Sequence, residues 1–467
     1  MSSLPADTGR GAAITEGALT TRRLPTAVRL VLLLTHLLAY GYALRTGRYV
    51  FPDTDRYLQA AYNLGHFGQL YARPLPAGPP VGQAVQELTI RPPGYPLLVL
   101  ALGAVGGQVA WLLLLQNALS YLVLATVLRG WAATRARPPG GWAWVLALAL
   151  TLSFPAQLIY ASAAMSEVPL QALLVLGAGL AARAWLTGRA GWLAGAGAAL
   201  VAAFLLKPVM YPFVGVFALA AGGLAWRWRR PALLALGLLP LALAAAYVAW
   251  NGQRTGYAQF SSISTINLLH YNAAGVLRQA QGPATENAWT AHVLRRADAQ
   301  PSFAARQQYL HAAALAVLRR YPLRYAAQHL LGTVIFFLDP GRFDLDRFLN
   351  PVPAPGLLDA VRGHGTAGLL AGLRRQPLSL LLTLVVVAGA NAARLLLAGR
   401  GLLRAVSPAN PAAAGANWLL LDTRAGRLVA LMLVLYLAVL TGPLGAARFL
   451  VPGYPLLLAL ALRGLRP

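Results

Sequence analysis

None of the 467 residues of this sequence is a cysteine, and this is its most informative absence. The chain therefore has no disulfide, no thiolate metal site and no cysteine nucleophile. Charge is also scarce: only 11% of the residues are charged, and only 13 of them are acidic. A soluble protein of this length needs more charged surface than that. The composition therefore excludes an ordinary soluble enzyme.

Long apolar runs take the place of the missing charge. The chain is 58% hydrophobic, and several apolar runs reach about 18–22 residues, the length at which a helix crosses about 30 Å of hydrocarbon. The short alternating segments of a membrane barrel are not seen. We predict an all-α polytopic membrane protein with about ten to twelve transmembrane helices.

The net charge of +26 comes almost entirely from arginine, since Lys207 is the single lysine. No basic tract with interleaved aromatic residues is present, so a nucleic acid partner is not expected. The arginines collect at alternate turns between apolar runs. The positive-inside rule places those turns in the cytoplasm of a multi-pass cell-membrane protein, where they also attract anionic membrane lipids.

This topology divides the chain into four parts. They are a disordered cytoplasmic tail at 1–25, an N-terminal transmembrane catalytic module at 26–250 with an outer loop at 45–93, an extracytoplasmic or interfacial helical segment at 251–376, and C-terminal transmembrane helices at 377–467. We expect single spans at 142–160 and 449–462. The apolar stretch at 321–338 either spans the membrane or lies at its surface.

The outer loop holds three of the four acidic residues found between Arg22 and Asn251. Two of them are Asp53 and Asp55, and we expect a short amphipathic helix from 55 to 67, lying along the interface. Asp55 is then either the N-cap of that helix or a functional carboxylate. Asp53 fits the cap position less well, and a carboxylate beside apolar walls can act as a general base.

The Asp53-Thr54-Asp55 triplet also matches the DxD pattern that holds a divalent cation in nucleotide-sugar transferases. A divalent cation therefore stays open as a cofactor, and no other cofactor is expected. The seven histidines have no spacing typical of a metal site, so no metal ligand is assigned.

Other candidate residues lie at the outer ends of apolar runs. Glu167 either complements a helix dipole or binds the sugar or the acceptor. Lys207 and Arg448 either extend their side chains to the interface or hold a lipid-linked phosphate, whose developing charge they would stabilise. Arg91 has the same two interpretations.

Four short segments carry a resemblance to a known family. They are PDTDRYLQAAYNL at 52–64, RPPGYPLL at 91–98, the Ser166-Glu167 turn followed by LLKP at 205–208, and ARFLVPGYPLLLALA at 447–461. In this order they resemble the GT-C membrane glycosyltransferases. More narrowly, they resemble bacterial family 39 proteins, the relatives of protein O-mannosyltransferases and of the aminoarabinose transferases that modify lipid A. The segment 251–376 has no match.

The resemblance implies a GT-C helical bundle whose large first outer loop carries interfacial helices. It implies transfer of a sugar from a polyprenyl-phosphate-linked donor to a lipid, glycan or protein acceptor on the extracytoplasmic side, with inversion. Aligning Arg56-Tyr57 with the family's Arg-Tyr pair places the catalytic base on Asp53. The family often has Asp-Glu where this chain has Asp53-Thr54, which leaves the role of Asp55 open.

The alternative from another class is a lipid or polysaccharide transporter or flippase. Such a protein needs functional charges or broken helices near the middle of the membrane. Here the carboxylates of the N-terminal half lie in outer turns, which favours the enzyme.

Overall fold

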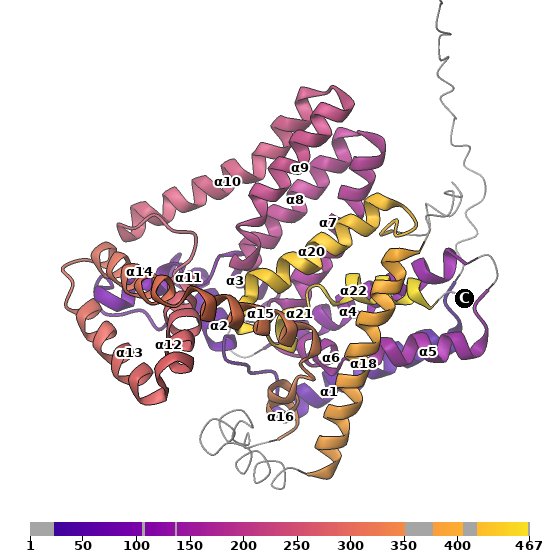
Figure 1. The fold of residues 1–467 in the computed structure, drawn as a ribbon, viewed down its shortest axis with the longest axis horizontal. Coiled ribbons are helices and arrows are strands. Elements are labelled where there is room, and N and C mark those ends of the chain that lie inside the picture. The colour runs from indigo at the N-terminus through magenta and orange to yellow at the C-terminus, as the bar shows by residue number, and fades with distance from the viewer. Residues whose placement is uncertain (1–22, 105–107, 136–137, 351–376, 405–417, 466–467) are drawn as a thin grey trace, which may run out of the picture.

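The computed structural model describes residues 23–104, 108–135, 138–350, 377–404 and 418–465, and these ranges fold into helices without a strand (Figure 1). The expected disordered tail at 1–25 and the end of the central segment at 351–376 lie largely or wholly outside the described residues. The prediction of an all-α membrane protein is confirmed.

The N-terminal helices are α1 (Thr26–Thr46), α2 (Thr54–Phe67), the 3₁₀ helix η1 (Gly82–Leu88), α3 (Gly94–Ala101), α4 (Ala110–Ala133), α5 (Gly141–Leu152), α6 (Pro155–Ala161), α7 (Glu167–Thr187), α8 (Ala190–Leu206), η3 (Pro208–Met210), α9 (Phe213–Trp228) and α10 (Pro231–Thr255). The central helices are α11 (Ile263–Asn267), the π-helical turn η4 (Leu268–Ala273), α12 (Ala274–Gln281), α13 (Pro283–Asp298), α14 (Phe303–Arg320), α15 (Pro322–Leu338) and α16 (Arg342–Leu349). The C-terminal helices are α18 (Leu378–Leu403), α20 (Arg424–Thr441), η5 (Gly442–Leu444), α21 (Ala447–Leu450) and α22 (Tyr454–Gly464).

Seven helices in the described ranges are long and apolar enough to cross a membrane. They are Thr26–Thr46, Ala110–Ala133, Glu167–Thr187, Pro208–Trp228, Pro231–Thr255, Leu378–Leu403 and Arg424–Leu444. The bent pair α5 and α6 makes up to eight, and α8 and α22 are shorter apolar helices. The total reaches the lower end of the predicted ten to twelve helices only when the bent pair and both shorter helices are counted as spans. The stretch that we left open at 321–338 forms α15, which is not among the candidate spans.

The outward segment at 142–160 is not the single span that we expected. It breaks into α5 and α6, which meet at 60°. Pro155 begins α6, and a proline disfavours helical backbone in the residue before it. Phe154 accordingly leaves the helical region, with φ −122° and ψ 82°. The break directs α6 and the turn that follows it toward the start of α7.

The expected last span at 449–462 is also divided, into the single turn α21 and the helix α22. Every residue of α22 is buried, because α18, α20 and α4 surround it. An 11-residue helix is too short to cross the hydrocarbon alone.

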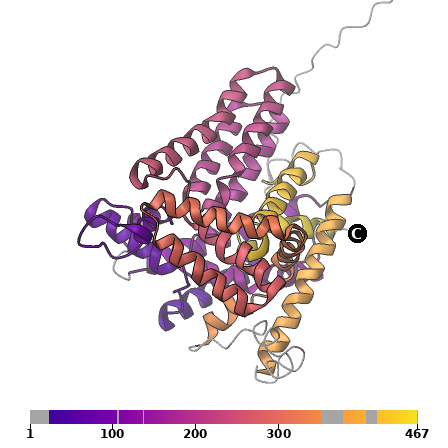
Figure 2. The same cartoon turned by 60° about the vertical axis from the view of Figure 1, so that its left-hand side comes forward.

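One large hydrophobic core joins the membrane helices, whereas the central helices have a small core of their own. That second core contains Leu269, Val276, Val293, Leu310 and Val317. Figure 1 shows α11–α14 lying beside α2, away from the bundle of α7–α10, and Figure 2 shows the same helices passing across the middle of the molecule. The central helices therefore lie next to the outer loop, at the end of the bundle where the predicted site residues gather.

Candidate active site

Asp53 is fixed in place by its neighbour Thr54. The hydroxyl of Thr54 accepts a hydrogen bond from the main-chain N–H of Phe51 at 2.9 Å and donates one to the carbonyl of Ala164 at 3.1 Å. These bonds tie the start of α2 to the turn between α6 and α7. Asp53 occupies the N-cap position, but its side chain caps nothing. Its carboxylate is therefore left to interact with other side chains.

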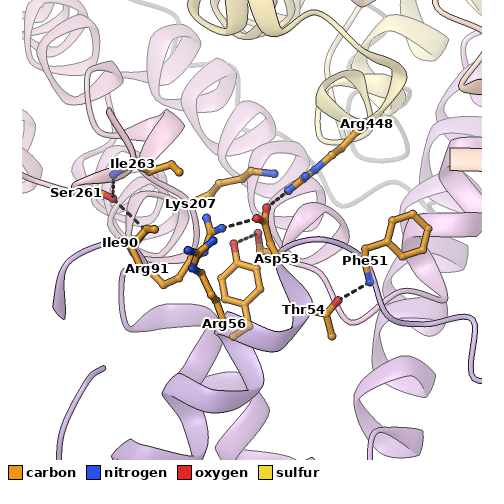
Figure 3. A network of polar contacts seen from close by, with 12 residues as sticks. Phe51, Asp53, Thr54, Arg56, Ile90, Arg91, Lys207, Ser261, Ile263 and Arg448 are labelled. Carbon is orange, nitrogen blue, oxygen red and sulfur yellow. Dashed lines mark hydrogen bonds and ion pairs between the residues drawn. The ribbon is translucent and has the colours of Figure 1, made fainter. Parts of the chain in front are cut away.

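Two arginines hold that carboxylate from opposite sides. Arg91 donates to Oδ1 of Asp53, and Arg448 donates to Oδ2 (Figure 3). Arg91 follows η1 in the outer loop and is only 6% exposed, with its guanidinium over the ring of Tyr57. Arg448 lies on α21, far along the chain. The outer loop and the C-terminal segment thus meet at Asp53.

Glu167 forms the second half of the same cluster. It is the first residue of α7 and is fully buried. Its Oε1 accepts a hydrogen bond from Nζ of Lys207 and another from Nε of Arg448, each at 2.6 Å. Its Oε2 is buried and has no hydrogen-bond partner among the described residues. Arg448 therefore bridges the two carboxylates, and one carboxylate oxygen is left to accept a hydrogen bond from a ligand.

Five of the predicted site residues thus meet in one cluster, which we call the outer cluster after the predicted topology, namely Asp53, Arg91, Glu167, Lys207 and Arg448. Three of them are cations and two are carboxylates, which leaves one excess positive charge. Nε of Arg91 is also buried without a hydrogen-bond partner in the described ranges. A buried site with net positive charge, one unused donor and one unused acceptor suits an anion that carries hydroxyl groups.

The charges in the outer cluster set the protonation of its members. Burial alone would raise the pKa of Asp53, but the charges of Arg448 and then Arg91 outweigh burial and hold that pKa below its usual value. Burial alone would lower the pKa of Arg448, but Glu167 and Asp53 raise it above its usual value. Asp53 is therefore ionised at neutral pH, and it is a weak base as long as both arginines hold it.

Asp55 does not belong to the outer cluster. It is exposed in the first turn of α2. Of the two alternatives for Asp55, the N-cap role is wrong, because the cap position falls on Asp53 and the helix begins at Thr54 and not at residue 55. The bonds of the Thr54 hydroxyl explain the shift, since they fix the chain one residue earlier than the pattern of apolar residues indicated.

The residues at the DxD triplet do not fit a divalent cation. Both carboxylate oxygens of Asp53 accept from arginines, and Asp55 is exposed. Within the described ranges, no group of three or more His, Asp or Glu side chains is placed to hold a metal ion. We therefore derive no step through a metal.

Sequence reasoning missed a third carboxylate close to the outer cluster. Asp344 on α16 is only 3% exposed and accepts a hydrogen bond from the hydroxyl of Tyr160 at 2.7 Å. Burial raises the pKa of Asp344 to about 7, although the bond from Tyr160 lowers it. The stretch Asp339-Pro-Gly-Arg-Phe-Asp344-Leu-Asp346 has three acids in a chain with only 13. That density was the available signal.

Asp339 supports the cluster through the main chain. Its Oδ2 accepts a hydrogen bond at 2.7 Å from the N–H of Ala447, the residue before Arg448. In the outer loop, Arg56 pairs with Glu87 at 3.1 Å. These two carboxylates therefore hold the segments that carry Arg448 and Arg91.

Comparison with known proteins finds two similar solved structures. Arabinosyltransferase EmbB from Mycobacterium smegmatis is 16% identical with a TM-score of 0.37, and the match covers 90% of this chain but only 42% of EmbB. ArnT from Cupriavidus metallidurans, solved with bound undecaprenyl phosphate, is 16% identical with a TM-score of 0.33, and the match covers 84% of each chain.

No family model matches the chain, and no curated protein matches its sequence. An identity of 16% with TM-scores of 0.37 and 0.33 does not decide an activity. The function is therefore inferred from the geometry of the outer cluster.

Proposed function

We propose that this protein is an integral membrane glycosyltransferase. In this proposal it transfers a sugar from a polyprenyl-phosphate-linked donor to an acceptor hydroxyl at the extracytoplasmic face. The observation that carries the proposal is the outer cluster, in which Asp53 and Glu167 lie between the cations of Arg91, Lys207 and Arg448. Such a set supplies both a proton acceptor and charge stabilisation for a leaving phosphate.

The donor phosphate is assigned to Lys207 and Arg448. Both cations share Oε1 of Glu167. Arg448 also reaches Asp53, as Figure 3 shows. A space of about 100 Å³ between α7, α8, α9 and α20 has an apolar lining that includes Met210 and Phe213, shortly after Lys207 in the chain. A cation beside an apolar space between membrane helices suits a phosphate that carries a hydrocarbon chain.

Asp53 is assigned as the general base. In the proposed step it takes the proton of the acceptor hydroxyl while that oxygen forms a bond to the anomeric carbon of the donor sugar. The bond between this carbon and the phosphate oxygen breaks, and the polyprenyl phosphate leaves with the electron pair. A single displacement of this kind inverts the anomeric configuration. Lys207 and Arg448 stabilise the negative charge that develops on the phosphate.

The ion pairs add a condition to this mechanism. While Arg448 and Arg91 hold Asp53, its low pKa makes it a poor proton acceptor. A donor phosphate competes with the carboxylates for Arg448 because it is also an anion with several acceptor oxygens. When Arg448 turns to the phosphate, the pKa of Asp53 rises and the base becomes active. In the proposed mechanism, donor binding therefore prepares the base.

The extracytoplasmic position of the site can be tested on this cysteine-free chain. Gln69 lies in the outer loop and Arg189 at the opposite end of α7, and both are exposed. In intact cells, an impermeant thiol reagent should label a cysteine that replaces Gln69 but not one that replaces Arg189. The reverse pattern contradicts the orientation.

The function itself is tested by mass spectrometry of envelope glycans and glycolipids from a deletion strain. We expect one glycan or glycolipid to lack a sugar in this strain. The parent gene should restore it, and a gene carrying Asp53→Asn should not. Restoration by Asp53→Asn contradicts the enzymatic proposal. Accumulation of the complete glycan on the cytoplasmic side would instead favour a transporter.

A further inference from the structure

A large polar cavity lies away from the outer cluster, between the central helices and α15. Its volume is about 740 Å³, and η4, α12, α13, α15 and η5 form its walls. Cavities that hold small ligands have volumes of roughly 300–1,000 Å³. Neither the proposed base nor the proposed phosphate site lines this cavity, so the roles assigned to them do not account for its polar residues.

One wall of the cavity is polar and contains an unused hydrogen-bond acceptor. Gln328 is 8% exposed, and its amide nitrogen donates to the main-chain oxygen of Tyr271 at 2.7 Å. Its Oε1 is buried without a partner among the described residues. The ring of Tyr271 is half exposed, and this residue belongs to the π-helical turn η4, a conformation that is frequent at functional sites. A ligand that donates hydrogen bonds and offers a flat apolar face suits this wall.

The charges on the polar wall cancel. Arg278 pairs with Glu286 at 2.9 Å, so the guanidinium already has an anionic partner. Burial lowers the pKa of His270, which keeps that side chain neutral at pH 7. The wall therefore offers no excess positive charge to a phosphate and fits an uncharged headgroup that is rich in hydroxyls.

Further along α15, past Gln328, the lining is apolar. Leu331 and Ile335 of α15 line the cavity together with Pro443 of η5. Leu331 is 56% exposed, and several other apolar side chains of α15 are exposed as well. A cavity in which polar groups adjoin an apolar stretch of α15 is suited to an amphiphile, whose chain can lie along the exposed face of this helix.

The elements that line the cavity also contact the segments that carry the outer cluster. Gly332 of α15 packs so closely on η5 that a Cβ at this position would lie 2.0 Å from the carbonyl oxygen of Gly442, and η5 leads directly to Arg448. On the other side, His270 also lines a second cavity of about 200 Å³, which Arg56 lines as well. Arg56 follows Asp53 by three residues on α2. His270 therefore borders both cavities, and the second cavity reaches α2, the helix that begins directly after Asp53.

We propose that the cavity between α12, α13 and α15 binds the acceptor, and that this acceptor is an amphiphile with an uncharged, hydroxyl-rich headgroup, that is, a glycolipid. The acceptor role rests on the proposed function, whereas the binding chemistry stands on the cavity alone. A headgroup hydroxyl that reaches past His270 toward α2 would approach Asp53.

Binding is measured on the full chain in lipid nanodiscs, with an environment-sensitive dye on a single cysteine that replaces Gln279 at the exposed rim. The probes are octyl glucoside below its micelle concentration, octyl phosphate and free glucose. We expect a saturable signal with octyl glucoside only. Equal binding of octyl phosphate overturns the uncharged headgroup, and equal binding of glucose overturns the amphiphile.

Two neighbouring leucines provide a matched control. Leu331 lines the cavity, whereas Leu330 on the same helix does not, and both are more than half exposed. We expect Leu331→Gln to weaken octyl glucoside binding about tenfold, the loss that corresponds to one or two buried methylene groups. Leu330→Gln should bind as the parent does. Equal effects of the two variants overturn the proposal.

Tyr271→Ala is a second test that leaves the Gln328 bond intact, because that bond uses the main-chain oxygen of residue 271. It should weaken octyl glucoside binding and, in a transfer assay, raise KM for the acceptor while KM for the donor stays unchanged. An unchanged acceptor KM together with parental binding overturns the proposal.

Asp53→Asn separates this proposal from the proposed function. This variant should bind octyl glucoside as the parent does, since binding requires no proton transfer. If it still transfers sugar, the proposed function fails and the cavity proposal is judged by binding alone. If it is inactive while Leu331→Gln and Tyr271→Ala bind normally, the cavity proposal fails and the function stands.

Discussion

Two arginines, the partly buried Arg448 and the fully buried Arg394, show how differently this membrane protein uses the same side chain. Arg448 bonds to the carboxylates of Asp53 and Glu167. Arg394 on α18 is fully buried and bonds instead to the carbonyl oxygens of Leu150 and Ser153, at 3.1 and 2.7 Å. A carboxylate partner can be exchanged for a phosphate, whereas a main-chain carbonyl cannot leave.

The two environments differ in what they leave unpaired. The outer cluster contains a buried carboxylate oxygen and a buried guanidinium N–H without partners in the described ranges. Arg394 uses all three nitrogens, since it also donates to Asn391 and to the hydroxyl of Ser153. It closes the end of α5 at the break before α6. Arg448 is therefore available to a ligand, whereas Arg394 holds the fold. Four predictions sharpen or break this distinction.

The largest effect is expected from Asp53→Asn. This change keeps the size of the side chain but removes the proton acceptor, and loss of a general base typically lowers a rate about 10²–10⁴-fold. Transfer by purified, correctly inserted protein measures the effect. Asp55→Asn is the matched control, because Asp55 is exposed and lies outside the outer cluster, and it should keep nearly parental activity. If Asp55→Asn is the inactive variant, the roles of the two residues are exchanged.

Arg448→Met and Lys207→Met come next. Each removes a cation assigned to the leaving phosphate, and loss of such a donor costs about 2–4 kcal/mol in the barrier. We expect a correspondingly lower kcat with the protein still folded. Arg73→Met removes an exposed arginine of the outer loop and should leave kcat unchanged. Parental rates in both Arg448→Met and Lys207→Met would show that these residues only anchor the helices.

Arg394→Met should act on stability and not on chemistry. It leaves buried carbonyl groups of Leu150 and Ser153 without this donor, which costs about 2 kcal/mol in the free energy of unfolding. Thermal unfolding in nanodiscs measures the loss, with Arg400→Met, an exposed residue on the same helix, as the control. A large fall in kcat with unchanged stability would contradict the distinction between the two arginines.

The smallest effect concerns Asp344, the carboxyl next to Tyr160. Because burial raises its pKa to about 7, the folded state binds this proton more tightly than the unfolded state, whose Asp has a pKa of about 3.9. Stability should therefore fall as the pH rises from 6 to 8, by about 1 kcal/mol, and level off above pH 8. Asp344→Asn should remove this slope from the melting temperature. An identical slope in the variant would show that another group titrates.

Much of the fold, and the placement of the cluster residues at the ends of apolar runs, could be predicted from the sequence, but their mutual contacts could not. Apolar length and the placement of arginines identify the helices and their outer ends, so Asp53, Glu167, Lys207 and Arg448 are expected at one surface. The pairing of Arg448 with Asp53 joins residues 395 positions apart, and no local pattern encodes that contact. The break at Pro155 was hidden because the apolar run continues through it.

Asp344 was missed for a different reason, although the density of acids around it was a signal. It lies in the central segment, where the chain resembles no motif and shows no simple periodicity. Its importance comes from burial against Tyr160 on α6, and α6 points that way only because the helix breaks at Phe154. The helix break at Phe154, which the sequence did not reveal, therefore also concealed the contact between Tyr160 and Asp344.

The central claim is that the carboxylates of the outer cluster compete with a phosphate for Arg448, and the affinity of Asp53→Asn for undecaprenyl phosphate tests it most directly. Native mass spectrometry of the purified protein can measure this affinity in the parent and the variant. Removing the competing negative charge should tighten binding about tenfold, or 1.4 kcal/mol, although the same variant is catalytically inactive. An affinity that is unchanged or weaker than that of the parent would contradict the exchange of partners at Arg448.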